Sequence, residues 1–223
     1  MGKIVKITTS DEAVRELCKS DILLCKLINV IGDHSMVLQS NYFESLVKKI
    51  IGQQLSIQAA NTIWNRVQTL CPDVNVKTVT NITDDDLRST GVSKAKIIYI
   101  RDLTEKITTG ELNLNSLITM NDTNVINSLT KVKGIGKWTA EMFLIFSLGR
   151  LNILSKNDVG LQRGIKWLYS IEDDELNLDY LFEKWSPYNT IVSLYLWEIV
   201  NRGFIAKFCD IEEFIKKNTH FNI

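Results

Sequence analysis

Apolar residues recur along most of the chain at intervals of three and four positions, and only two prolines interrupt this pattern. These intervals place apolar side chains on one face of an α-helix, so the chain is predicted to be all-α. The expected helices span residues 10–18, 21–31, 41–51, 57–70, 84–89, 93–108, 122–131, 138–148, 159–170, 174–184, 188–202 and 210–217. The segment KIVKITT at residues 3–9 has a strand-like composition and is expected to pair with one other strand or with none.

The segments between the helices indicate two helical lobes. Loops are expected at residues 71–83 and 149–157, and the chain has neither a low-complexity linker nor a repeat array. We expect residues 41–149 to form one lobe. Residues 1–40 and 150–223 are expected to form the other, with the N-terminal helices packed beside the C-terminal ones.

Composition argues against several classes of protein. No apolar run approaches eighteen residues and the first residues lack the layout of a signal peptide, so we expect a cytoplasmic protein that does not enter a membrane. The four cysteines form no CxxC pair and only two histidines accompany them, so no zinc site is expected. We interpret all four cysteines as small core side chains.

Charge is balanced over the chain but unevenly distributed. The 26 basic and 26 acidic residues cancel, yet residues 131–170 carry an excess of five positive charges and residues 172–183 are strongly acidic. This pattern indicates one basic and one acidic face, and the basic face could attract a polyanion. A solvated charge pattern without a partner is the alternative.

The most informative segment runs from Asn121 to Gly149 and places Gly134-Ile135-Gly136 between two predicted helices. Glycines permit a tight turn with positive φ and let a phosphate approach the backbone, while the following helix offers its free N–H groups to an anion. Three lysines surround the turn: Lys131, Lys133 and Lys137. The alternative is a glycine-broken pair of helices with surface lysines.

Read together with ILSKNDVGLQRG at residues 153–164, the segment LTKVKGIGKWTAE resembles the helix-hairpin-helix DNA glycosylases that carry a downstream aspartate. Within that superfamily (HhH-GPD), the chain is most similar to the 3-methyladenine DNA glycosylase II group. Further matches are YFESLVKKIIGQQLS (42–56), GVSKAKIIYIRDL (91–103) and WSPYNTIVSLYLW (185–197). The resemblance implies two helical lobes flanking a substrate cleft, a helix-hairpin-helix at about residues 121–149, and hydrolysis of alkylated purines flipped out of duplex DNA.

Cleavage of a glycosidic bond leaves positive charge on the sugar, which a nearby carboxylate stabilises. Asp158, at the start of the helix predicted at 159–170, is our candidate catalytic residue. The alternative is a simple helix cap, although the two roles are compatible because a helix N-terminus keeps a carboxylate ionised.

Purines methylated on a ring nitrogen are cationic, so aromatic faces would recognise them. By the resemblance, Trp138 and Trp197 match pocket positions, Met142 lies where an aromatic residue is common, and Tyr188 and Tyr42 are weaker candidates. The other tryptophans, Trp64, Trp167 and Trp185, are expected in the core.

The resemblance also implies a set of DNA contacts. The expected set is Gln53, Gln54, Ser56, Lys133, Gly134, Ile135, Gly136 and Lys137. Gln54 is our candidate for insertion into the vacated base stack, and Ser56 also suits a helix cap; a polar turn is the alternative for Gln53 and Gln54. Relatives often hold Na⁺ or K⁺ on hairpin carbonyls, here those of Thr130, Val132 and Ile135.

Two family features are missing from this sequence. Relatives that also cut the strand have a lysine where this chain has Trp138, so we expect a monofunctional enzyme. The four-cysteine iron–sulfur loop of another branch is missing, since only Cys209 lies in that region, and no cofactor is expected to be required. We expect a monomer acting on damaged double-stranded DNA. A glycosylase for oxidised or deaminated bases, and a non-catalytic DNA-binding module in which Asp158 only caps a helix, remain as alternatives.

Overall fold

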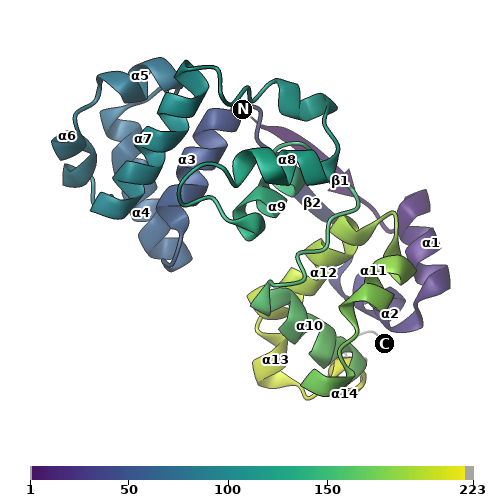
Figure 1. Cartoon of the computed structure of the whole chain (residues 1–223). Coiled ribbons are helices and arrows are strands. Elements are labelled where there is room, and N and C mark those ends of the chain that lie inside the picture. Colours follow the sequence, from purple (N-terminus) through teal and green to yellow (C-terminus); the bar gives the residue numbers. More distant parts are fainter. Residues whose placement is uncertain (1, 219–223) are drawn as a thin grey trace. The chain divides into compact units, whose positions relative to one another are not determined.

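The computed structural model describes residues 2–218, which divide into two compact units. Gln39–Leu148, with Gly2, form one unit, here called the hairpin unit, and Lys3–Leu38 with residues 149–218 form the other, here called the terminal unit. Both are built mainly of helices (Figure 1), which confirms the predicted all-α class.

The hairpin unit contains seven α-helices and one 3-10 helix within the described residues. They are α3 (Tyr42–Gly52), α4 (Ile57–Leu70), α5 (Val76–Asn81), α6 (Asp84–Ser89), α7 (Lys94–Thr108), η1 (Ser116–Thr119), α8 (Asp122–Leu129) and α9 (Lys137–Phe146). Polar side chains start several of these helices by accepting a backbone N–H of the first turn, among them Asn41, Ser56 and Ser93. The core between the helices includes Leu46, Ile50 and Phe143.

The terminal unit joins the two ends of the chain. Its elements are β1 (Lys3–Ile7), α1 (Glu12–Ser20), α2 (Ile22–Ile31), β2 (His34–Leu38), α10 (Val159–Tyr169), η2 (Asp173–Glu175), α11 (Leu178–Trp185), α12 (Asn189–Asn201), α13 (Phe204–Lys207) and α14 (Ile211–Asn218). β1 and β2 pair antiparallel with Ile4 opposite Val37. α10 packs closely on α12 at Gly164, where a Cβ would lie only 2.9 Å from the Leu196 carbonyl oxygen.

Several sequence-based expectations need correction. Residues 71–83, expected to be a loop, contain α5, which Asn75 and Thr78 start with a reciprocal capping box. The helix expected at 174–184 begins at Leu178, because Asn177 caps it. β2 and α13 were not predicted. The interpretation of every cysteine as a core side chain is wrong for Cys209, which is exposed, whereas Cys71 is buried. The predicted core tryptophans Trp64, Trp167 and Trp185 are indeed buried.

A buried carboxylate fastens three helices of the terminal unit together. Asp21, only 2% exposed, caps α2 by accepting the Leu24 N–H at 3.1 Å. It also accepts hydrogen bonds from the Trp185 indole at 3.0 Å, the Lys184 amine at 2.8 Å and the Tyr169 hydroxyl. Burial would raise the pKa of Asp21, but these donors outweigh burial and lower its pKa.

Candidate nucleic-acid interface and active site

The glycine hairpin between α8 and α9 is the candidate DNA-binding element of the hairpin unit (Figure 1). Val132 and Ile135 are buried and anchor it, with the Ile135 N–H donating to the Val132 carbonyl at 3.1 Å. Gly134 has φ +77°, and a Cβ there would lie 2.1 Å from the Tyr99 ring. Gly136 has φ −89° and occupies the N-cap position of α9. Of the two hairpin glycines, only Gly134 therefore has the expected positive φ. The first turn of α9 presents its N–H groups at the hairpin.

Two of the three hairpin lysines, Lys133 and Lys137, are paired with acidic side chains of the same unit. Lys133, 68% exposed, has its Nζ 3.3 Å from a carboxylate oxygen of Asp102, whose other oxygen accepts the Lys133 backbone N–H at 2.9 Å. Lys137 Nζ lies 3.8 Å from the Glu141 carboxylate one turn along α9. Asp102 thus holds the hairpin backbone, and the positive field at the turn is weaker than the lysines alone would produce.

The loop between α3 and α4 is joined to the hairpin. The Gln53 side-chain amide donates to the Gly134 carbonyl at 2.8 Å, so at least part of its hydrogen-bonding capacity serves the protein. Gln54 is exposed and has φ 57°, in the left-handed region. Ser56 caps α4 by accepting the Ala59 N–H at 3.2 Å. Sequence reasoning missed Lys96 of α7, whose amine donates to the carbonyls of Ile51 and Gln53, both at 2.8 Å.

Asp158 is the candidate catalytic residue of the terminal unit. It is the N-cap of α10, and its Oδ1 accepts the Leu161 N–H at 2.9 Å and the Trp197 indole N–H at 3.3 Å. A Cβ at Gly160 would lie 3.0 Å from the same oxygen, so a side chain there would require the carboxylate to shift by a few tenths of an ångström. The expected cap is present, and α12 supplies a second donor to the carboxylate.

Each residue predicted to contact the base belongs to one of the two units. In the hairpin unit, Trp138 is 45% exposed and Met142 is buried one turn further along α9. In the terminal unit, Trp197 contacts Asp158 as described, and Tyr188 is half-buried at the start of α12. A hydrogen bond to the Glu16 carboxylate raises the pKa of Tyr188, which indicates that its hydroxyl faces α1.

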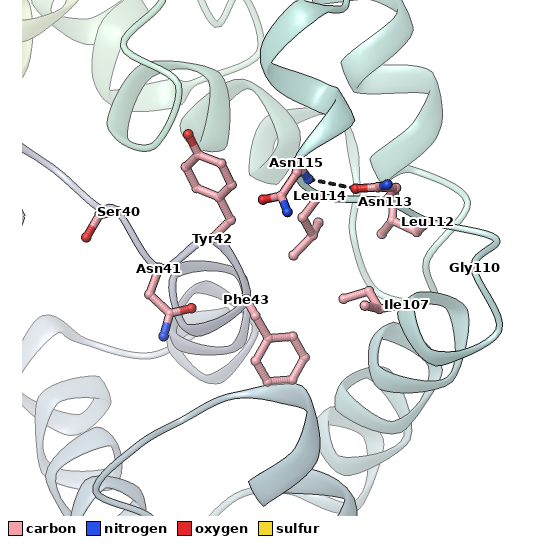
Figure 2. A pocket seen from close by; sticks show the side chains of 10 residues that line it. All are labelled: Ser40, Asn41, Tyr42, Phe43, Ile107, Gly110, Leu112, Asn113, Leu114 and Asn115. Atoms are coloured by element: carbon pink, nitrogen blue, oxygen red, sulfur yellow. Dashed lines mark hydrogen bonds between the residues drawn. The ribbon is translucent and has the colours of Figure 1, made fainter.

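Tyr42, like Tyr188 a weaker pocket candidate, lines a hollow of about 610 Å³ in the hairpin unit. Figure 2 shows Tyr42 and Asn41 on one side of this hollow and Asn113 and Asn115 on the other. Its ring makes an edge-to-face contact with Phe143, with 5.5 Å between centroids. The hollow has no acidic or basic side chain in its lining, so none of the candidate catalytic or phosphate-binding residues belongs to it.

Two features of the described part of the chain bear on other functions. Among residues 2–218 there is no group of three or more His, Cys, Asp or Glu side chains placed to hold a metal ion. Within the same residues, no helix is long and apolar enough to cross a membrane.

The helical fold, the glycine hairpin and the downstream Asp158 agree with the resemblance to helix-hairpin-helix DNA repair proteins. Residues 47–187, more than half of the chain, match the HhH-GPD superfamily of base excision DNA repair proteins, and the chain belongs to that superfamily.

Individual relatives agree with this family. The chain is similar to the crystal structure of a DNA-3-methyladenine glycosidase from Bacillus halodurans, with 40% identity, a TM-score of 0.85, and coverage of 95% of this chain and 99% of that one. DNA-3-methyladenine glycosylase 1 of Schizosaccharomyces pombe is 29% identical over 86% of this chain and 91% of its own length. A 3-methyladenine DNA glycosylase of the same yeast, solved with abasic DNA, shares the fold, with 24% identity, a TM-score of 0.74, and coverage of 86% of this chain and 97% of that one.

Proposed function

We propose that this protein is a DNA glycosylase that hydrolyses the N-glycosidic bond of alkylated purines, such as 3-methyladenine and 7-methylguanine, in duplex DNA. The observation that carries the proposal is the carboxylate of Asp158, held at the start of α10 by Leu161 and Trp197. A module that only bound DNA could cap α10 with a neutral serine or asparagine and would avoid the repulsion between a carboxylate and a polyanion. Relatives named for 3-methyladenine support the choice of substrate.

The chemistry needs one carboxylate. When the bond from C1′ to the ring nitrogen breaks, the electron pair leaves with the base and positive charge develops on the sugar. Asp158 stabilises that charge, and water adds to C1′ and releases a proton, which leaves an abasic site. A base methylated on a ring nitrogen is already cationic, so it departs as a neutral molecule without a general acid.

In this proposal the reaction stops at the abasic strand. Strand cleavage through a Schiff base needs an amine at the position of Trp138, and an indole nitrogen cannot serve because its lone pair belongs to the ring. Lys137, one residue earlier, lies 3.8 Å from the Glu141 carboxylate, which supports a role at the protein surface rather than at the sugar.

The proposed partner is duplex DNA containing a damaged base, bound by a monomer. The first-turn N–H groups of α9 and the side chains of Lys133 and Lys137 would hold a phosphate. The carbonyl oxygens of Thr130, Val132 and Ile135 are ligands of the kind that bind Na⁺ or K⁺. The Val132 carbonyl oxygen accepts a hydrogen bond from Ile135 and keeps a second lone pair. These ligands therefore fit a monovalent cation, which would supply positive charge beside the phosphate. No other cofactor is proposed.

The test is base release from duplexes that contain alkylated, deaminated or oxidised bases, compared side by side. Asp158→Asn should lower release of alkylated purines at least about a hundredfold, the scale for losing one electrostatic stabiliser, with binding to an abasic duplex retained. Asp174→Asn, which removes one negative charge from an exposed residue of η2, is the matched control. Release by Asp158→Asn at the rate of this control would refute the assignment, and preferential release of an oxidised or deaminated base would refute the substrate class.

A further inference from the structure

Lys96 is a basic side chain directed at the backbone of another helix. Its amine donates to the carbonyl oxygens of Ile51 and Gln53, at 2.8 Å in each case, across the end of α3. Burial lowers the pKa of Lys96, as expected where a lysine amine is drawn from water towards carbonyl groups. A cation at this end of α3 also opposes the partial negative charge of the helix dipole.

The two carbonyls that Lys96 holds, at residues 51 and 53, lie just before a strained residue. Gln54 has φ 57°, a left-handed conformation that costs a residue with a Cβ free energy and persists only where the surroundings enforce it. The backbone bonds of the turn itself are long, at 3.3 Å from the Gln53 N–H to Ile50 and at 3.3 Å from the Leu55 N–H to Gly52. The shorter bonds from Lys96 therefore supply much of the constraint.

The same loop is held from a second direction. The Gln53 side chain donates to the Gly134 carbonyl at 2.8 Å, which joins the loop to the hairpin. Bonds from α7 and to the hairpin therefore both hold Gln53, the residue that leads into Gln54. Preorganisation of this kind avoids an ordering cost at the moment of binding.

We propose that Lys96 is a positioning residue that holds the Gln53–Leu55 loop so that Gln54 fills the gap left in DNA by the extruded base. The proposal rests on the proposed glycosylase function and extends it to a residue that acts through the loop. Lys96 thereby differs from Lys133 and Lys137, whose expected contribution is to phosphate binding.

The experiment compares binding to a duplex containing a tetrahydrofuran abasic-site analogue with binding to the undamaged duplex. Lys96→Met should weaken abasic binding roughly tenfold, the scale of a lost charge-assisted hydrogen bond, with a much smaller effect on undamaged DNA. Lys94→Met removes the same charge from an exposed residue of α7 and should affect both duplexes equally. Lys96→Arg should restore most of the preference. The fluorescence of a 2-aminopurine base beside the abasic site reports base stacking. Its change on protein binding should be smaller with Lys96→Met than with the wild-type protein.

A double-mutant cycle with Gln54→Ala identifies the route of the effect. If Lys96 acts through Gln54, Lys96→Met should cost less than twofold in abasic binding when Gln54 is already alanine. The full tenfold loss in that background, or an unchanged preference with Lys96→Met alone, would overturn this role. If Lys96→Met does not fold, Lys96→Gln takes its place in the cycle. A wild-type protein with no preference for abasic DNA would overturn this role, whereas the base-release assay tests the proposed function separately.

Discussion

Gly134 offers a quantitative test of the hairpin, because two independent effects prohibit a side chain there. At φ +77° an alanine is strained by about 1–2 kcal/mol. Its Cβ would also lie 2.1–2.5 Å from three carbons of the Tyr99 ring, so the ring must move, at a further cost of about 1–3 kcal/mol. Gly134→Ala should therefore destabilise the protein by about 3 kcal/mol, which lowers the melting temperature by roughly 6–12 °C for a chain of this size.

The chain contains a matched control two residues away. Gly136 has φ −89°, and a Cβ there would meet nothing within 4 Å, so Gly136→Ala should cost well under half as much. In a protein that already carries Tyr99→Ala, the ring is absent and the collision cannot occur. Gly134→Ala in that background should therefore cost only the strain at φ +77°. The assay is thermal unfolding by circular dichroism. Equal melting temperatures for Gly134→Ala and Gly136→Ala would refute this account of the hairpin.

Three further predictions concern charge and chemistry. Lys133→Ala and Lys137→Ala should each weaken binding to all duplex sequences alike and reduce the slope of log K against log salt by about one unit; unchanged affinity and slope in both would exclude the hairpin as the DNA anchor. Borohydride treatment with substrate DNA should trap no adduct because Trp138 cannot form a Schiff base, and an adduct lost in Lys137→Ala would contradict this. Asp21→Asn should cost about 3 kcal/mol in urea unfolding, the low end for a buried pair, because Lys184 loses its partner. Since the folded-state pKa of Asp21 is lowered, its contribution to the free energy of unfolding is present above about pH 4 and is lost as pH falls through that lowered pKa. If the free energy of unfolding of Asp21→Asn depended on acid pH in the same way as that of the wild-type protein, this reasoning would be refuted.

The elements that the sequence predicts well are those with local signals. The helices at Ile57–Leu70 and Asp84–Ser89 match the expected spans because Ser56 and Thr83 cap their first turns. α5 escaped prediction because VKTVTN is short and rich in β-branched residues, which have low helix propensity, and its capping box is needed to start it. β2 escaped because a five-residue strand is stabilised by a partner about thirty positions away.

The candidate functional residues likewise fall into those with local sequence signals and those that depend on distant partners. Asp158 and the glycine hairpin could be identified from sequence because each depends on residues within a few positions. The bond from Gln53 to Gly134 joins residues 81 positions apart, and that from Lys96 to Gln53 joins residues 43 apart. Neither helical periodicity nor residue type distinguishes Lys96 from other lysines of the chain. Only the packing of α3, α7 and α9 in the hairpin unit reveals that these side chains act on one loop.

Trp197 shows why residues assigned separately from sequence can belong to one functional element. Its indole N–H donates to Oδ1 of Asp158 at 3.3 Å, and the missing side chain of Gly160 leaves room for that approach, since a Cβ there would lie 3.0 Å from the oxygen and 3.7 Å from the Trp197 ring. A hydrogen bond to an ionised carboxylate both fixes its direction and stabilises its charge. The aromatic surface proposed for base recognition and the carboxylate proposed for catalysis are therefore coupled through one nitrogen. Any change at Trp197 alters the setting of Asp158 as well as the face available for stacking.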